Sequence, residues 1–370
     1  MEKTDRPRIL YLDAARCAAV FLIALNHAVN RSWANFGAVA EEFHSISLPS
    51  TVVKALLTVA SRYGVPLFLM ITGALILRKR FETAEDVRRF YRHNWLSLLI
   101  TGEIWFFLGF WFQVLVNPGN HMLAELGLGE TLRACLKTLL FLDQVRFDSM
   151  WYVPMILSVY LVLPIFAVFL RHTALRRALL LPLVLLLWTA MLLPVINSYR
   201  RMFGQNSFTN YLYYSNFFSE YLLYILAGWW VAEGGLRKLS GRTVIAAALL
   251  CYLLCTALQI WYYSRSDHLI DYDSPALLLS AVPAFECFRR WAGRLRRWEK
   301  PITAVSRAAF ALYLLHVFFV WGIHWYCDLS AWSRPAKVLL FELVPLGLSG
   351  LLIWPLSKFP FCRKYLFLIK

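Results

Sequence analysis

Long apolar runs separated by short polar segments dominate the chain. Each run is close to the ~20 residues that a helix needs to cross a bilayer. The eighth run is the weakest, because Pro275 and Pro283 interrupt it. The pattern predicts an all-α polytopic membrane protein, a single bundle of about ten transmembrane helices that fills residues 1–370 as one domain. The predicted spans are residues 9–30, 52–77, 94–116, 151–170, 178–196, 214–234, 243–263, 274–290, 303–326 and 335–357.

Composition and charge agree with a membrane protein. Hydrophobic residues make up 59% of the chain and charged residues 16%, which excludes an ordinary soluble domain. The net charge of +16 does not indicate a nucleic-acid partner, because Lys and Arg concentrate in alternate loops. The positive-inside rule then places both termini in the cytoplasm, as an even number of spans requires. The first run lacks a small-residue cleavage site, so we expect it to act as an uncleaved insertion signal.

Cysteine and histidine give no sign of a disulfide framework or a metal site. The seven cysteines are odd in number and lie mostly within or beside the predicted spans. The eight histidines show no spacing typical of metal ligands. We therefore predict no metal and no permanently bound cofactor.

The first predicted span contains two ionisable residues, Arg16 and His27, eleven positions apart. Eleven residues return a helix to within about 20° of the same face and rise about 16 Å. Because ionisable groups inside a bilayer are costly, they are candidates for function. Asp13 lies one turn before Arg16, so the two side chains can pair. Asp13 and Arg16 also fit a helix anchor at the cytoplasmic interface, and His27 alone also fits an interfacial polar group.

The second predicted span places Arg62 just before a helix break. Pro66 disturbs the helix, while Gly64 and Gly73 allow close approach of another backbone. Arg62 beside such a kink indicates the wall of a cavity. The alternative is a packing kink in which Arg62 pairs with an acid.

Further polar and aromatic residues add possible partners. Tyr313 and His316 share one helical face, and Trp151-Tyr152 opens the fourth predicted span. Glu220, in the outer half of the sixth span, is the acid closest in predicted depth to His27. Its carboxylate would orient an imidazole base or bind an acceptor hydroxyl, although pairing with a membrane arginine explains it equally well.

Five segments, taken in order, resemble the integral-membrane acyltransferase-3 family, whose members acylate, and mostly O-acetylate, sugars of bacterial envelope polysaccharides and glycolipids. The resemblance covers the whole chain. It rests on Tyr11-Leu-Asp-Ala-Ala-Arg16 followed by His27, Val65-Pro-Leu-Phe-Leu-Met-Ile-Thr-Gly73, the stretch from Trp151-Tyr152 to Pro164, Tyr221-Leu-Leu-Tyr-Ile-Leu-Ala-Gly228, and Leu312-Tyr-Leu-Leu-His316.

The chain also departs from the family pattern. Many members have a Trp-Ser-Leu segment followed by a glutamate in the fourth-span region, and others have a histidine just before the tryptophan pair. Here the segment is Met150-Trp-Tyr-Val-Pro154, preceded by Ser149. A catalytic role at that acidic or histidine position is therefore not carried over. The chain looks like the short branch without an appended serine-hydrolase domain.

The resemblance implies roles for the candidate residues. We expect Arg16, with basic residues of the inner loops, to hold the anionic CoA or the acyl carbonyl. His27 is expected to deprotonate an acceptor hydroxyl or to carry the acyl group, and Arg62 to stabilise oxyanion charge or position the donor. The expected substrate-binding residues are Asp13, Glu220, Trp151, Tyr152, Tyr313 and His316.

The resemblance also implies the partners: acetyl-CoA or another acyl-CoA as donor substrate, an envelope saccharide as acceptor, and membrane lipid. We expect a multi-pass protein of the bacterial cytoplasmic (inner) membrane. The acceptor sugar, the acyl group and the oligomeric state stay open. A transporter or flippase for an envelope precursor is the alternative, although the chain lacks the repeat symmetry or paired broken helices common in transporters.

Overall fold

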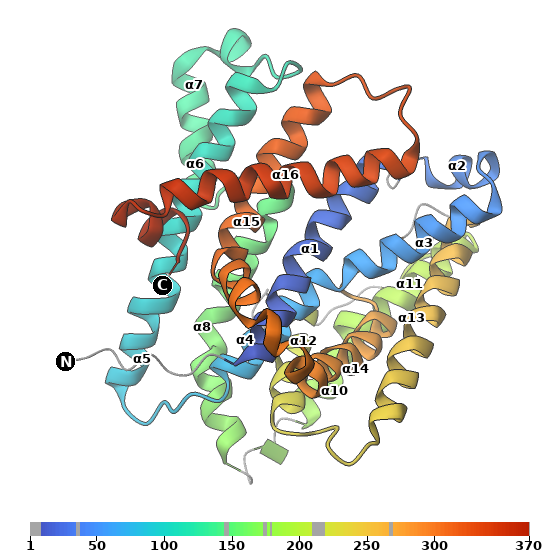
Figure 1. Cartoon of the computed structure of the whole chain (residues 1–370), viewed down its shortest axis with the longest axis vertical. Coiled ribbons are helices and arrows are strands. Elements are labelled where there is room, and N and C mark those ends of the chain that lie inside the picture. The colour runs from blue at the N-terminus through green and yellow to red at the C-terminus, as the bar shows by residue number, and fades with distance from the viewer. Residues whose placement is uncertain are drawn as a thin grey trace. The chain divides into compact units, whose positions relative to one another are not determined.

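The computed structural model describes residues 9–34, 38–143, 148–172, 176–177, 180–208, 219–265 and 269–369. Within these ranges the chain forms helices and no strands (Figure 1). The all-α prediction is therefore confirmed.

Eight helical runs in the described part of the chain are long and apolar enough to cross a membrane. The eighth and ninth predicted spans lie in one run, Pro275–Tyr326, because a short 3₁₀ segment joins their helices without a break. The sixth is described only as a helix of 13 residues, Glu220–Ala232, because residues 209–218 lie outside the described ranges. A multi-pass helical protein is confirmed, while ten spans and cytoplasmic termini stay predictions.

The chain folds into two compact units. The first unit comprises Met1–Asn26, Trp33–Lys79 and Phe169–Ala309, and the second comprises His27–Ser32, Arg80–Val168 and Phe310–Lys370. Helices α1 (Leu10–Ser32) and α15 (Glu299–Tyr326) contribute residues to both units, as does α8 (Tyr152–Arg171), whose last three residues belong to the first unit. That residues 1–370 act as one membrane domain stays a prediction.

The other helices divide between the units. Those of the first unit are α2 (Val39–Ser45), α3 (Leu48–Arg62), α4 (Gly64–Ile76), α10 (Leu180–Leu187), η3 (Trp188–Leu192), α11 (Leu193–Met202), α12 (Glu220–Ala232), α13 (Gly241–Tyr263), α14 (Pro275–Trp291) and η5 (Ala292–Trp298). Those of the second unit are α5 (Ala84–Phe90), η1 (Tyr91–Trp95), α6 (Leu96–Val116), α7 (Met122–Leu139), η2 (Asp148–Trp151), α16 (Arg334–Leu356), η6 (Cys362–Leu366) and all but the last turn of α8 (Tyr152–Arg171).

In the first unit, the backbones of α4 and α12 touch. A Cβ atom added to Gly73 would lie 1.8 Å from the carbonyl oxygen of Ile225, and one added to Gly228 would lie 2.1 Å from that of Met70. Glycine is required at both positions because no side chain fits. The predicted break in the second span is confirmed at Tyr63, where α3 ends and α4 begins. This break positions Arg62 at the C-terminus of α3.

In the first unit, the Tyr199 ring of α11 and the Trp261 ring of α13 stack with centroids 6.5 Å apart.

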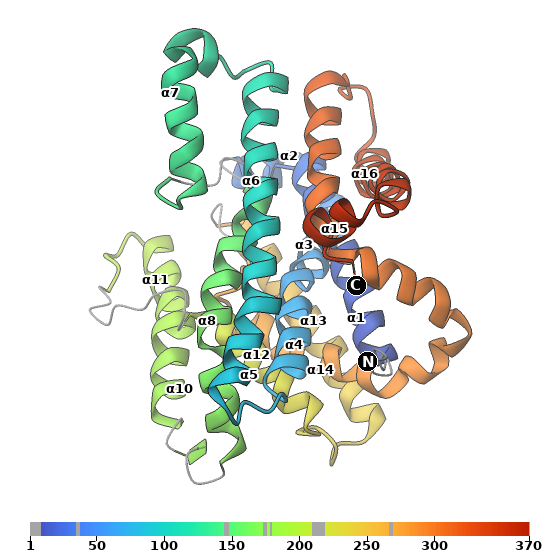
Figure 2. The ribbon, with the colours of Figure 1, turned by 90° about the vertical axis from the view of Figure 1, so that its left-hand side faces the viewer.

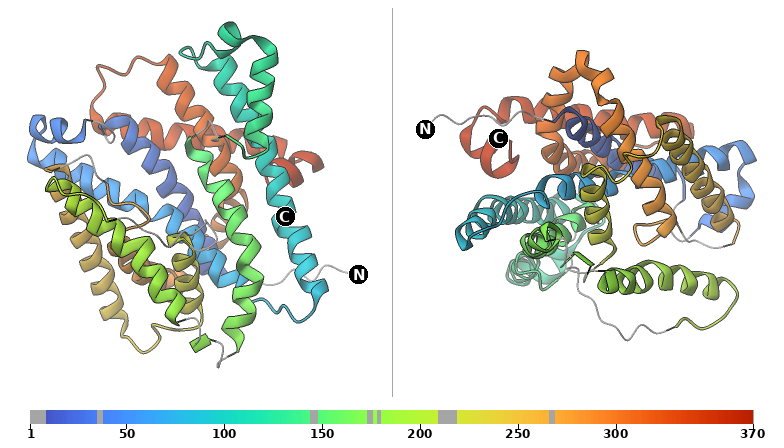
Figure 3. Two further views of the ribbon diagram at one scale, coloured as in Figure 1. Left: turned by 180° about the vertical axis from the view of Figure 1, so that it is seen from behind. Right: turned by 90° about the horizontal axis from the view of Figure 1, so that it is seen from below.

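In the second unit, α6 and α7 form a hairpin (Figures 2 and 3). Phe110, Val114 and Cys135 make its buried cluster. The sequence predicts a short interfacial or re-entrant helix over residues 131–142, a stretch too short to span a membrane. The observed helix begins earlier, at Met122, and has a kink at Gly127, whose φ of 73° favours glycine.

Candidate functional site

In the first unit, α1 contacts α15 through a polar triad in which Asp13 and Ser306 are buried and Arg16 is half-buried. The Ser306 hydroxyl donates to Asp13 Oδ1 at 2.6 Å. The Arg16 Nη1 group donates to Asp13 Oδ1 at 3.0 Å and to Ser306 Oγ at 2.8 Å. Asp13 and Ser306 are each 3% exposed. The predicted pairing of Asp13 with Arg16 is confirmed, and Ser306 holds both partners.

Sequence reasoning missed Ser306. Serine is common in membrane helices, so it carries no signal by itself. Its position does carry one, because Ser306 lies ten residues before His316 on α15, much as Arg16 lies eleven before His27 on α1. When α1 and α15 pack in parallel, these nearly equal spacings bring Arg16 next to Ser306 and His27 next to His316.

In the second unit, α1 contacts α15 again, through the imidazoles of His27 and His316. Their ring centroids are 5.3 Å apart. His316 is fully buried, whereas His27 is half-buried. We call these two residues the imidazole pair.

The hydrogen bonding of His316 fixes its tautomer. Its Nδ1 lies 2.9 Å from the carbonyl oxygen of Leu312, which only accepts hydrogen bonds. Nδ1 must therefore carry the proton, and the neutral ring presents an unprotonated Nε2. That nitrogen is buried and has no hydrogen-bond partner in the protein. An orphaned buried acceptor of this kind calls for a functional explanation.

Buried tyrosines continue from the imidazole pair. The Tyr313 ring centroid is 6.4 Å from that of His316 and 5.8 Å from that of Tyr152. Trp151 lies at the surface end of this series, with its ring centroid 6.2 Å from that of Tyr152 and 37% of its surface exposed. The second unit thus brings together five predicted site residues from three segments of the chain.

Arg62 belongs to the first unit and lies beside an acid. It is 6% exposed, and its Nη1 is 3.5 Å from Asp271 Oδ1. The guanidinium carbon lies 5.8 Å from the ring centroid of Tyr272. The predicted alternative, in which Arg62 pairs with an acid, is confirmed, yet its Nε is buried without a hydrogen-bond partner. Burial raises the pKa of Tyr272 to about 12, although Arg62 opposes the shift.

Glu220 opens α12 in the same unit, within electrostatic range of Asp271 and Asp273. Burial, followed by repulsion from Asp271, raises the pKa of the Asp273 carboxyl. Glu220 and His27 belong to different units, so their expected partnership stays a prediction.

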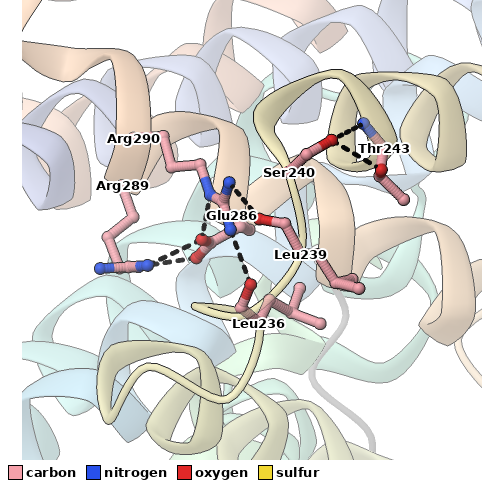
Figure 4. Close-up of polar contacts among 7 residues, drawn as sticks. All are labelled: Leu236, Leu239, Ser240, Thr243, Glu286, Arg289 and Arg290. Atoms are coloured by element: carbon pink, nitrogen blue, oxygen red, sulfur yellow. Dashed lines mark hydrogen bonds and ion pairs between the residues drawn. The ribbon is translucent and has the colours of Figure 1, made fainter.

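Figure 4 shows a charged clamp around Glu286, an acid inside a predicted span. Glu286 is completely buried and accepts two hydrogen bonds from Arg289, at 2.6 and 2.7 Å. Arg290 Nε also donates to it, at 2.5 Å. The two terminal nitrogens of Arg290 donate to the carbonyl oxygens of Leu236 and Leu239, at 2.6 and 2.8 Å. Glu286 is thus fully partnered, and the clamp anchors the turn after α12 to α14.

The second unit also has a groove of about 490 Å³ along α5, η1 and the start of α6. Arg88 and Arg92 supply positive charge there, and Tyr91 and Trp95 supply aromatic rings. The Tyr91 hydroxyl donates to the Leu161 carbonyl and the Trp95 indole to that of Leu157, which fixes both rings against α8. Segment η1 is a π-helical turn, a feature frequent at functional sites. The remaining lining residues are Ala84, Val87 and Leu96.

Across the described ranges, no three or more His, Cys, Asp or Glu side chains are grouped so as to hold a metal ion.

Comparison with known proteins gives one match. The model of a family described as an acyltransferase domain matches residues 9–356. Searches of curated proteins and of solved structures return no match.

Proposed function

Because this chain belongs to the acyltransferase-3 family and is a multi-pass membrane acyltransferase, we propose that it moves an acetyl group from cytosolic acetyl-CoA to a saccharide hydroxyl. The acceptor is a cell-envelope saccharide or lipid-linked glycan, and the protein lies in the bacterial cytoplasmic membrane. The observation that carries the proposed chemistry is the imidazole pair, in which a buried histidine presents an unprotonated nitrogen beside a second, accessible histidine.

His27 acts as the general base in this proposal. It removes the proton of the acceptor hydroxyl while the oxygen attacks the thioester carbonyl, and the C–S bond then breaks to release CoA. The proton returns from the imidazolium to the departing CoA sulfur. His316 is a positioning residue, whose Nε2 accepts a hydrogen bond and steadies the charged form of its neighbour. General base catalysis of this kind contributes about 10²–10⁴-fold to a rate.

His27 as a transient acyl carrier is the second mechanism. In that case the imidazole itself attacks the thioester, CoA leaves, and the acceptor hydroxyl then takes the acetyl group from the ring. A protein that is labelled by [¹⁴C]acetyl-CoA without acceptor, through a bond cleaved by hydroxylamine, supports the carrier. Absence of such label alongside normal transfer supports the base.

In this proposal, two arginines of the first unit bind the donor and stabilise the negative charge that develops on the thioester carbonyl oxygen. Asp13 and Ser306 hold one terminal nitrogen of Arg16, which orients its guanidinium for the donor. Arg62 has a buried Nε without a hydrogen-bond partner, which suits stabilisation of an oxyanion. In both roles the arginine acts by donating hydrogen bonds from a fixed position, and it transfers no proton.

The groove of the second unit suits the nucleotide part of the donor. Arg88 and Arg92 are matched to the phosphates of CoA, because guanidinium groups bind phosphate in a bidentate manner. The rings of Tyr91 and Trp95, fixed by their hydrogen bonds, provide faces for the adenine. Trp151, Tyr152 and Tyr313 are proposed to bind the acceptor beside the imidazole pair.

The test is label transfer in membranes that contain the protein. With [¹⁴C]acetyl-CoA and an envelope glycan extract, we expect label in the glycan, and none with His27→Ala at equal expression. Normal transfer by that variant would refute the proposed chemistry. Movement of an intact glycan across the membrane without label transfer would instead identify the alternative function, a transporter or flippase. Mass spectrometry of the labelled glycan identifies the acyl group and its carrier together.

A further inference from the structure

An arginine and three carboxylates of the first unit lie together, at the end of α3, at the start of α12 and on the segment between α13 and α14. Arg62 is 6% exposed, and its Nη1 lies 3.5 Å from Asp271 Oδ1. Glu220 and Asp273 lie within electrostatic range of Asp271 and of each other. We call Arg62, Glu220, Asp271 and Asp273 the arginine-carboxylate cluster.

Hydrogen bonds hold the segment that contains Asp271 in place. The Tyr224 hydroxyl donates to the Tyr272 carbonyl oxygen at 3.0 Å, and the Ile270 amide donates to Gln259 Oε1 at 2.8 Å. The Tyr272 amide donates to Asp271 Oδ1 at 2.8 Å. The Asp271 carboxylate is therefore fixed through one oxygen, and because its side chain is 50% exposed, a ligand has access to it.

A separate observation, at Arg62 Nε, also indicates a ligand. This hydrogen-bond donor is buried and has no hydrogen-bond partner among the described residues, which is rare in proteins. The guanidinium faces the cluster, since Nη1 contacts Asp271 and the guanidinium carbon lies 5.8 Å from the Tyr272 ring centroid. In the proposed function this N–H group binds the oxyanion. Because the oxyanion and the attacking oxygen are bonded to the same carbon atom, the acceptor sugar lies beside Arg62 and thus beside Asp271.

We propose that Asp271 is a specificity-determining residue for the acceptor: it accepts a hydrogen bond from the sugar hydroxyl next to the one that is acylated, and it selects a sugar without acidic groups. This inference rests on the proposed function, since it names the class of acceptor for the same reaction. Glu220 and Asp273 add negative charge on the same side of the ligand.

The hydrogen-bonding groups and charges of the cluster select this class of sugar. A carboxylate only accepts hydrogen bonds and a guanidinium only donates them, so the ligand has to supply both kinds of group. Two adjacent sugar oxygens, one of them a hydroxyl, do so. A carboxylate or phosphate on the sugar would instead face three carboxylates, against which Arg62 and Arg201 supply two positive charges. Like charges at close range repel, so acidic sugars bind more weakly.

Another ion pair of the first unit provides a matched control. Arg78 Nε lies 2.9 Å from Glu233 Oε1, and the Glu233 side chain is 48% exposed, close to the 50% of Asp271. Exposed ion pairs of this kind contribute little to stability. Substitutions at Glu233 therefore report what the loss of a half-exposed contact between an arginine and a carboxylate does, without touching the arginine-carboxylate cluster.

The test is binding of short oligosaccharides to the full chain in phosphatidylcholine nanodiscs without donor, measured by fluorescence anisotropy. The probes come from partial hydrolysis of an envelope glycan extract, carry a neutral fluorophore at one end, and are separated by anion exchange into neutral and acidic fractions. We expect the neutral fraction to bind about tenfold more tightly than the acidic one. Asp271→Ala should weaken binding of the neutral fraction about tenfold, because the sugar hydroxyl loses its acceptor. Asp271→Asn keeps an acceptor oxygen but removes a negative charge, so the acidic fraction should bind about threefold more tightly than to the natural chain.

Controls separate direct contact from folding and from catalysis. Glu233→Ala and Glu233→Gln should leave the Kd of both fractions unchanged. If Asp271 had only a structural role, Asp271→Asn would weaken both fractions alike, so tighter binding of the acidic fraction indicates direct contact. Three results overturn the inference: equal binding of the two fractions, no binding of the neutral one, or an unchanged Kd in a folded Asp271→Ala protein. Selective binding that depends on Asp271, in a chain that never transfers acetyl, overturns the proposed function instead.

Discussion

Helices α1 and α15 contact each other in both units, and the two contacts differ in how well their polar groups are hydrogen-bonded. In the first unit, Asp13, Arg16 and Ser306 exchange hydrogen bonds, and the buried carboxylate is balanced by a cation and a hydroxyl. In the second, two imidazoles lie together, and His316 Nε2 is left without a partner. Satisfied polar groups stabilise a fold, whereas an orphaned one lowers stability and is retained where it has a function. One helix pair thus provides a hydrogen-bonded anchor and the proposed reactive centre.

The largest expected effect is at the imidazole pair. His27→Ala should lower kcat by about 10³-fold or more, and His316→Ala by about 10²-fold, because base and positioning partner act as one unit. For the same reason, the double variant should be no worse than His27→Ala alone. The measurement is [¹⁴C]acetyl transfer at equal protein. Multiplicative losses in the double variant would show that the two histidines act independently.

The next effect is at Arg16, and it should be seen first in stability. Arg16→Ala removes one cation from the buried Asp13 carboxylate, which costs about 3 kcal/mol. Adding Asp13→Asn removes the buried negative charge and should restore most of the stability, measured by thermal unfolding in detergent. Transfer activity in this stable double variant then separates the roles of Arg16. Near-normal activity would show that Arg16 is only an anchor.

A smaller effect is expected at Ser306. Ser306→Ala removes one hydrogen bond to Asp13 and one from Arg16, for a loss of about 1–3 kcal/mol in unfolding free energy. His27 and His316 keep their contact, so kcat should fall by less than about tenfold. Ser306→Thr retains the hydroxyl and is the matched control. If Ser306→Ala equals His27→Ala in activity, the two contacts are not separate in function.

The smallest expected effect on stability and activity is at Cys17. Its thiol donates to the Ile302 carbonyl oxygen at 3.2 Å, where α1 contacts α15 in the first unit. Thiols are weak donors, so Cys17→Ala should change unfolding free energy by less than about 1 kcal/mol and leave transfer unchanged. Cys17→Ser tests the hydrogen bond with the size conserved. A strong loss of transfer in Cys17→Ala would show that the thiol has a role in the reaction and not only in packing.

Sequence reasoning found what depends on spacing along one helix. The pairing of Asp13 with Arg16 and the shared face of Tyr313 and His316 follow from helical geometry, and Pro66 located the break before α4. The all-helical membrane class followed from the length of the apolar runs.

Contacts between segments far apart in the chain could not be predicted from the sequence. Ser306 meets Asp13 across 293 positions, and the spacing of Ser306 from His316 becomes a signal only once α1 and α15 are known to pack together. The neighbour of a residue within a helix is set by the 3.6-residue period, whereas the neighbour on another helix depends on which faces pack. The missing hydrogen-bond partner of His316 Nε2 depends on the whole surrounding core, so only the structure reveals it.

The glycine contact between α4 and α12 limits how the first unit can move. With Gly73 and Gly228 in backbone contact, sliding or rotation of one helix on the other would drive carbonyl groups into each other. The two helices therefore move as one rigid body. If this unit opens during turnover, the backbone has to bend elsewhere, at a joint such as Tyr63 between α3 and α4. The contact between α4 and α12 then provides the rigid group of atoms relative to which the movement of the other helices can be measured.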